Sequence, residues 1–196
     1  MKSVNCDRLI LNGDIIDGWH LRKAGTKKWQ AKHTDFFKVI MKMMENFGTE
    51  VIYVRGNHDG NYDRRPPEGC DCIEDKLVVF NGLRIAGLGG SRLYSGGKNQ
   101  YSEREMKNRI WKLGWKIRRA GGVDIVVAHA PVRGVGDGDD YAHMGFEAFL
   151  PLLDRYKPRY FIHGHVHMEY GRDIARMLRR GDTTIINACE RYTLEV

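Results

Sequence analysis

The chain of 196 residues lacks several features that mark secreted and membrane proteins. No apolar run approaches the roughly 20 residues that a membrane-spanning helix needs. Residues 1–6 lack the apolar stretch of a signal peptide, so we expect a cytoplasmic protein without a transmembrane segment. Cysteine is scarce, and no C-x-x-C pair occurs. Cys70 and Cys72 stand too close together for an ordinary disulfide. We therefore expect Cys6, Cys70, Cys72 and Cys189 to be reduced thiols.

Internal repeats and low-complexity segments are also missing. A chain of this length with 42% hydrophobic residues can form one sizeable core but is short for two, which predicts a single domain over residues 1–196. The formal net charge is +7, with basic runs at 27–28, 116–119 and 176–180. Such runs can bind nucleic acid, but they more often form solvated helix faces whose long stems cover apolar surface.

Short apolar runs alternate with amphipathic stretches along the chain. Strands are predicted at residues 8–12, 51–55, 124–128 and 159–163, each ending in a polar turn. Helices are predicted at residues 34–47, 102–119 and 145–156, and hairpins at residues 77–88 and in a final strand pair ending at residues 183–187. This alternation predicts an α/β layered domain.

Four polar motifs follow the predicted strands directly. They are Gly13-Asp14-Ile15-Ile16-Asp17, Gly56-Asn57-His58-Asp59, Ala128-His129-Ala130-Pro131 and Gly164-His165-Val166-His167. In α/β sheets, ligands collect beyond the carboxyl ends of strands, where loops from neighbouring strands meet. The placement of the motifs therefore predicts one shared site.

The side chains in these motifs suit a divalent metal centre. Asp14 offers a carboxylate, Asn57 an amide oxygen, and His129, His165 and His167 offer imidazoles, a mixture that fits Mn, Fe, Zn or Ni. Two such ions about 3.5–4 Å apart can activate water and shield a phosphoryl group during ester hydrolysis. Each motif alone is a weak signal, because Gly-Asp turns and single histidines are commonly structural. Four of them in this order are a strong one.

The order resembles that of the calcineurin-like metallophosphoesterases, whose pattern is D-x-H, G-D-x-x-D, G-N-H-D/E, a lone H and G-H-x-H. The resemblance implies an α/β fold with two facing sheets covered by helices, an α-β-β-α sandwich. It implies hydrolysis of phosphate monoesters, diesters or pyrophosphates with two divalent ions. By the pattern, Asp14 would bridge the ions, Asn57, His129 and His165 would complete the second site, and His167 would serve the first.

The same pattern implies roles for three further residues. His58 would act near the leaving group, Asp59 would orient it, and Asp17 would support the ligands from behind. No D-x-H precedes Gly13. We therefore expect the first ion to be weakly held and activity to be impaired. We also expect the family's first strand and helix to lie before Met1, so that the domain is N-terminally incomplete.

Two parts of the chain resemble different branches of the family. Residues 9–59 are similar to the UDP-2,3-diacylglucosamine hydrolases, which suggests a nucleotide-lipid substrate. From Gly60 onward the chain is similar to generic bacterial phosphoesterases of unassigned substrate, which leaves a small phosphoester as the other substrate and suggests a spliced or recombined sequence. The basic, aromatic insert at residues 19–29 stands where a lid would. Two other functions stay open: a non-catalytic interaction module on the same fold, and a nucleic-acid phosphodiesterase.

Overall fold

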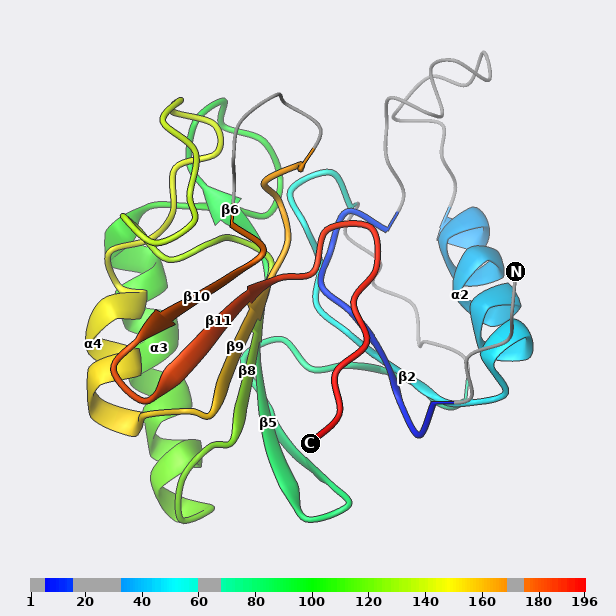
Figure 1. The fold of residues 1–196 in the computed structure, drawn as a ribbon. Coiled ribbons are helices and arrows are strands. Elements are labelled where there is room, and N and C mark those ends of the chain that lie inside the picture. The colour runs from blue at the N-terminus through cyan, green and yellow to red at the C-terminus, as the bar shows by residue number, and fades with distance from the viewer. Residues whose placement is uncertain (1–5, 16–32, 60–67, 169–174) are drawn as a thin grey trace.

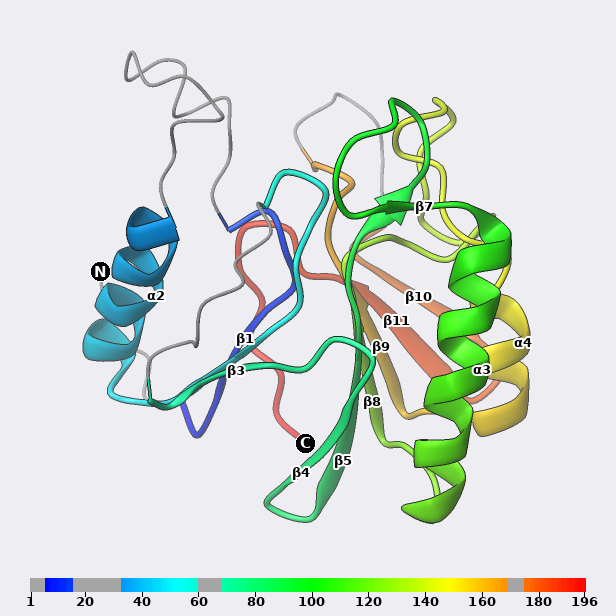
Figure 2. The same cartoon turned by 180° about the vertical axis from the view of Figure 1, so that it is seen from behind.

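A computed structural model of the chain describes residues 6–15, 33–59, 68–168 and 175–196 (Figure 1). Two sheets face each other, and helices lie on the outer face of each sheet (Figures 1 and 2). The predicted α/β fold with an α-β-β-α layering is therefore confirmed. No helix in these four stretches is long and apolar enough to cross a membrane.

The smaller sheet contains three parallel strands in the order β1-β2-β3. They are β1 (Leu9–Leu11), β2 (Val51–Tyr53) and β3 (Cys70–Cys72), and helix α2 (His33–Phe47) covers their outer face. Along β2 the side chains alternate. Val51 and Tyr53 pack with Ile40 of α2, whereas Ile52 belongs to a second apolar cluster on the inner face. This period of two is expected for a strand that is buried on both faces.

The larger sheet has six strands in the order β10-β11-β9-β8-β5-β4, and its four central strands run parallel. In chain order they are β4 (Leu77–Phe80), β5 (Leu83–Leu88), β8 (Ile125–Ala128), β9 (Tyr160–His163), β10 (Met177–Arg180) and β11 (Thr183–Asn187). Helices α3 (Glu103–Arg119) and α4 (Phe149–Tyr156) cover its outer face (Figure 2). Parallel central strands bring their carboxyl ends to one edge of the sheet.

Strand β8 shows how the larger sheet joins its two neighbouring layers. Ile125 and Val127 face the smaller sheet and pack in the same cluster as Ile52. Val126 and Ala128 point the other way, into the cluster that α3 and α4 share with the sheet. The continuous apolar sequence of β8 therefore fills two cores at once and fixes the spacing between the two sheets.

Helix α3 begins where the sequence predicts, because its start carries a reciprocal cap. The Ser102 hydroxyl accepts the Glu105 N–H at 3.3 Å, and the Glu105 carboxylate accepts the Ser102 N–H at 2.7 Å. Such a capping box satisfies two backbone donors that a helix start otherwise leaves without partners.

Helix α4 begins at Phe149, four residues later than residue 145 where we predicted its start. The N–H groups of Glu147 and Ala148 donate to the Glu103 carboxylate of α3, at 2.8 and 3.1 Å. This contact joins segments more than 40 residues apart. A pattern of neighbouring residues in the sequence cannot predict this contact, so it could not predict the later start of α4.

The hairpin around Asn81-Gly82 forms as predicted, with positive φ angles of 47° and 80° at the two turn residues. Both angles suit the tight turns that Asn-Gly favours. Three short strands were not predicted: β3, and the pair β6 (Ser91–Arg92) and β7 (Gln100–Tyr101). Strands of two or three residues are too short to show the alternation of apolar and polar side chains from which a strand is predicted. All four cysteines are free thiols, as their spacing predicts.

Candidate metal centre

The described residues of the four polar motifs lie at one edge of the two sheets, beyond the carboxyl ends of β1, β2, β8 and β9 (Figure 1). The smaller sheet supplies Asp14 and Asn57, and the larger sheet supplies His129 and His165. Ligand atoms of Asp14, His129 and His165 lie within 4.8 Å of one another. The predicted convergence of strand ends is therefore present for these side chains.

His129 is at the centre of this group and is almost fully buried. Its Nε2 lies 3.0 Å from Asn57 Oδ1, 3.2 Å from His165 Nδ1 and 3.4 Å from Asp14 Oδ2. Its Nδ1 lies 2.8 Å from the carbonyl oxygen of Asn12. Nε2 of His129 thus faces three side-chain atoms that can bind a metal ion, and its Nδ1 faces the main chain.

The backbone contacts fix which nitrogen of each ring carries hydrogen. The Asn12 carbonyl accepts the Nδ1–H of His129, which leaves a lone pair on Nε2. The Ala142 carbonyl, 2.8 Å from His165 Nε2, leaves the lone pair of that ring on Nδ1. Metal-binding histidines commonly donate their second N–H to a carbonyl in this way.

The result is a cluster of lone-pair atoms around His129 Nε2. The His165 Nδ1 nitrogen, the Asn57 amide oxygen and an Asp14 carboxylate oxygen all lie within 3.4 Å of it. Such an arrangement is repulsive unless a proton or a cation lies among the donors. The residues present therefore fit a divalent metal ion, with two nitrogen and two oxygen donors.

The pKa values of Asp14, His129 and His165 also show that this cluster attracts positive charge. Burial opposes ionisation of Asp14, but the neighbouring His129 and His58 outweigh it and hold the pKa of Asp14 well below its ordinary value. Burial also opposes a charge on His129, yet Asp14 raises the pKa of that ring above its ordinary value. Burial, reinforced by repulsion from His129, lowers the pKa of His165 to about 3. A proton on His129 can therefore stand in for the cation.

Two of the donor residues have backbone conformations that L-amino acids rarely adopt. Asp14 has a φ of 50° and His165 a φ of 67°. Such left-handed positions cost of order 1–3 kcal/mol each and persist where the surroundings demand them. Gly56 adds a further constraint, because a Cβ at this position would overlap the Asp14 carboxylate. The two turns therefore hold the metal-donor side chains in place at a cost in local backbone energy.

The loop that carries Asn57 is held by four hydrogen bonds that involve the side chains of Tyr94, Asn99 and Asp59. Tyr94 accepts the Asn57 side-chain N–H at 3.0 Å, which turns the amide oxygen towards His129. Asn99 donates to the carbonyl oxygens of Gly56 and Asp59, at 3.0 and 2.8 Å. The buried Asp59 carboxylate accepts the Gly56 N–H at 2.8 Å. Sequence reasoning missed Tyr94 and Asn99, because each lies about 40 residues beyond its partner.

His58 is adjacent to the donor cluster. Its backbone N–H donates to Asp14 Oδ1 at 2.8 Å, and its side chain is half-buried. This contact is made by the main chain, so it does not depend on the imidazole. The hydrogen bond to the Asp14 carboxylate therefore persists whatever side chain stands at position 58.

His167 lies outside the three-residue cluster, with an exposed side chain. A hydrogen bond from His167 is the main cause that lowers the pKa of the Cys189 thiol. The turn is anchored by the buried Asn187 at the end of β11, which donates to the Val166 carbonyl at 2.9 Å and approaches Met168 Sδ at 3.6 Å. Asp17 and the insert at residues 19–29 lie outside the described residues.

His163 does not join the donor cluster. Its ring lies near Phe161, which belongs to the apolar cluster that α3 and α4 share with the larger sheet. His163 is buried, and burial lowers its pKa to about 4. The folded state therefore disfavours its protonation. The contribution of neutral His163 to the free energy of unfolding is complete above pH 6.5, the ordinary pKa of histidine. It is lost as the pH falls towards 4.

The lowered pKa of His163 predicts how the stability of the metal-free protein depends on pH. Between pH 6.5 and 4.5 the wild type should lose about 2 kcal/mol more unfolding free energy than His163→Gln, which cannot titrate. Urea denaturation at several pH values measures both slopes. The other groups of the site titrate in both proteins, so their effects cancel in the comparison. Equal slopes would show that His163 is not held neutral by burial.

The chain matches the calcineurin-like phosphoesterase family over residues 2–169 and belongs to that family. It is 24% identical over 204 residues to UPF0046 protein K07C11.7 of Caenorhabditis elegans, a match that covers 91% of this chain and 65% of the relative. The chain thus spans about two thirds of that relative's length.

Two crystal structures share the fold. One has a TM-score of 0.62 at 14% identity and covers 94% of this chain and 80% of its own. The other, TT1561 of Thermus thermophilus, has a TM-score of 0.60 at 15% identity and covers 94% and 77%. The resemblance of residues 9–59 to the UDP-2,3-diacylglucosamine hydrolases is not confirmed by these comparisons and stays a prediction.

Proposed function

We propose that the chain hydrolyses phosphate esters at a divalent metal centre held by Asp14, Asn57, His129 and His165. Family membership implies a metal-dependent phosphoester hydrolase. The observation that carries the proposal is the convergence of four lone-pair donors whose ring tautomers are set by carbonyl contacts. When bound, such ions supply a deprotonated water and shield the charge on the phosphoryl oxygens.

The protein's own residues have distinct roles in this proposal. Asn12 and Ala142, through their carbonyl oxygens, keep the two imidazoles in the metal-binding tautomer. His58 stabilises charge or delivers a proton at the leaving oxygen, and Asp59 fixes the loop that carries it. His167, with Asp14, is the remaining donor pair for a first ion. Because two donors hold an ion weakly, we expect one tight site per chain, with Mn, Fe, Zn or Ni.

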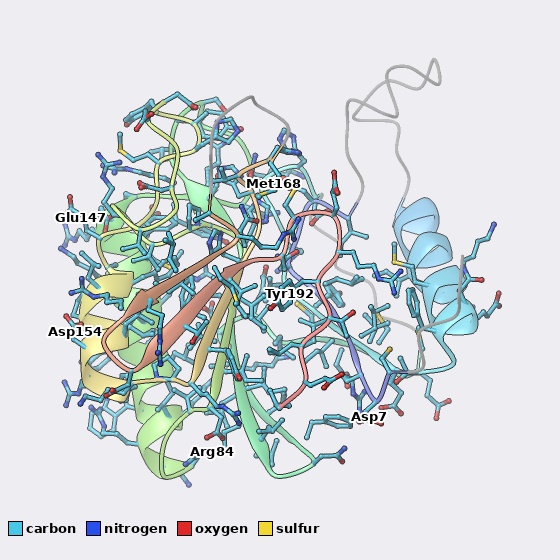
Figure 3. The ribbon with its side chains drawn as sticks, viewed as in Figure 1. Asp7, Arg84, Glu147, Asp154, Met168 and Tyr192 are labelled. Atoms are coloured by element: carbon cyan, nitrogen blue, oxygen red, sulfur yellow. The ribbon has the colours of Figure 1, made fainter. Side chains whose placement is uncertain are left out.

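The test begins with metal removed by a chelator. The metal-free protein should hydrolyse neither p-nitrophenyl phosphate nor bis(p-nitrophenyl) phosphate, and added Mn²⁺ should restore turnover of at least one ester. Asp154→Asn is a suitable control, because Asp154 pairs with Arg180 on the outer surface, away from the site (Figure 3). Turnover that survives complete chelation would contradict the proposal. Tight metal binding without turnover of either ester would favour a non-catalytic interaction module.

The nucleic-acid phosphodiesterase is the second candidate, and helix α3 is the observation in its favour. Trp111 and Trp115 are exposed on α3, surrounded by lysine and arginine residues. The Arg118 guanidinium lies 4.4 Å over the Trp115 ring, which occupies the face that a base would need for stacking. Helix α3 also covers the outer face of the larger sheet (Figure 2), whereas His129 and His165 follow the carboxyl ends of β8 and β9. Small phosphoesters are therefore the preferred substrates.

A further inference from the structure

Arg92, at the end of β6, has an unusual set of partners. Its Nη1 lies 2.8 Å from the Met144 sulfur, and its guanidinium lies 5.9 Å from the centre of the Tyr141 ring. Within the described part of the chain, no carboxylate lies at ion-pair distance from Arg92. A thioether and an aromatic ring leave the positive charge of a half-buried guanidinium without a neutralising anion.

The position of Arg92 relates it to the donor cluster through two loops. Residues 89–99 reach the cluster through Tyr94, which contacts Asn57. Residues 133–145 reach it from the other side, where the ring of His143 lies 5.2 Å from that of His165. The two loops lie side by side at the site edge of the larger sheet (Figures 1 and 2). Arg92 belongs to the first loop and contacts the second, next to His143.

Arg92 and Tyr94 connect the same loop to both sides of the site. The pairing of the loop with β7 continues one residue past β6, because the Leu93 N–H donates to the Tyr101 carbonyl at 2.9 Å. Tyr94, two residues after Arg92, contacts Asn57 of the donor cluster. Arg92 itself contacts Met144, the residue after His143, whose ring adjoins that of His165.

The loop at residues 133–145 is tied by its own aspartates. Asp140 accepts the backbone N–H of His143 at 3.1 Å and lies 2.8 Å from its Nδ1. Asp137 pairs with Arg133 and accepts the N–H of Gly145, at 2.9 and 3.0 Å. These carboxylates are engaged within the loop, and so is the charge of Arg133. Among the described residues, Arg92 is therefore a cation next to this loop that has no acidic partner.

We propose that Arg92 binds a second negative charge of the substrate, which makes the site selective for phosphate monoesters over diesters. This inference rests on the proposed function. A monoester carries about −1.5 to −2 charge at neutral pH and three non-bridging oxygens, whereas a diester carries one charge and two such oxygens. The planar guanidinium fork matches a phosphoryl group and can donate two parallel hydrogen bonds to it. The extra oxygen of a monoester is the one that Arg92 contacts.

The test compares two esters in metal-loaded protein. Arg92→Met keeps the length of the side chain and removes its charge, and it should lower kcat/KM for p-nitrophenyl phosphate about 10- to 100-fold. For bis(p-nitrophenyl) phosphate the same variant should lose less than about threefold. Arg92→Lys should fall between these limits for the monoester, because it keeps the charge without the fork. Arg119→Ala, which removes one charge at the far end of α3, is the matched control and should change neither value.

Binding of inorganic phosphate decides the inference independently of turnover. In calorimetric titrations, Arg92→Met should weaken phosphate binding about 10-fold or more and leave dimethyl phosphate binding unchanged. If the metal-loaded wild type hydrolyses neither ester, the proposed function fails, and these titrations still decide the role of Arg92. Unchanged phosphate binding, equal losses for both esters, or a loss of metal from Arg92→Met would each overturn the assignment.

Discussion

Replacement of His129 by alanine is expected to abolish stoichiometric metal binding. The ring is buried and its Nε2 faces Asn57, His165 and Asp14 within 3.4 Å, so no other group can replace it. Loss of a residue that merely supports a ligand costs about 10- to 100-fold in metal affinity, and loss of a direct donor should cost more. Metal content per purified chain, followed by calorimetric titration with Mn²⁺, measures the effect.

The same measurement extends to Asp14→Ala, Asn57→Ala and His165→Ala. His163→Gln is the matched control, since it alters a buried histidine of the same region that does not join the cluster. Circular dichroism of each variant establishes that the fold is intact. Full stoichiometric metal in any two of the four alanine variants would refute the assignment of the donors.

Replacement of His58 is expected to separate catalysis from metal binding. His58→Ala and His58→Asn should retain metal, because the contact of His58 with Asp14 is made by a backbone N–H that every variant keeps. Turnover of p-nitrophenyl phosphate should fall about 100- to 10,000-fold, the usual contribution of a positioned acid or base. The loss should appear in kcat and kcat/KM alike, as for an interaction made in the transition state.

The leaving group gives this prediction a sharper form. Phenyl phosphate has a poorer leaving group than p-nitrophenyl phosphate and depends more on protonation of the departing oxygen. His58→Ala should therefore impair phenyl phosphate more severely. Asp59→Asn keeps an oxygen acceptor for the Gly56 N–H and serves as the companion variant. If His58→Ala instead loses its metal, His58 is a ligand and its proposed role is wrong.

The sequence was informative wherever a signal is local. Buried strands and their polar ends could be predicted because apolar runs, glycines and donor side chains follow one another within a few residues. The turn at Asn81-Gly82 and the cap at Ser102 are local in the same sense. These signals sufficed to place Asp14, Asn57, His129 and His165 at one edge of the sheets.

The supporting contacts could not be predicted, because they depend on the packing of distant segments. Tyr94 reaches Asn57 over 37 residues, and the Asn12 carbonyl meets His129 over 117. The late start of α4 follows from Glu103, which lies in another helix. Tyrosine, asparagine and a main-chain carbonyl are ordinary residues and groups in loops, so nothing in the sequence distinguishes them.

The division of the donors between the two sheets has a mechanical consequence. Asp14 and Asn57 move with the smaller sheet, and His129 and His165 move with the larger one. An ion held by all four would act as a cross-link between the layers. At a concentration 100 times its dissociation constant it would add about 2.7 kcal/mol to the unfolding free energy. Conversely, any change in how the layers slide on the shared cluster around Ile52 and Val127 would be transmitted to the ion as altered affinity.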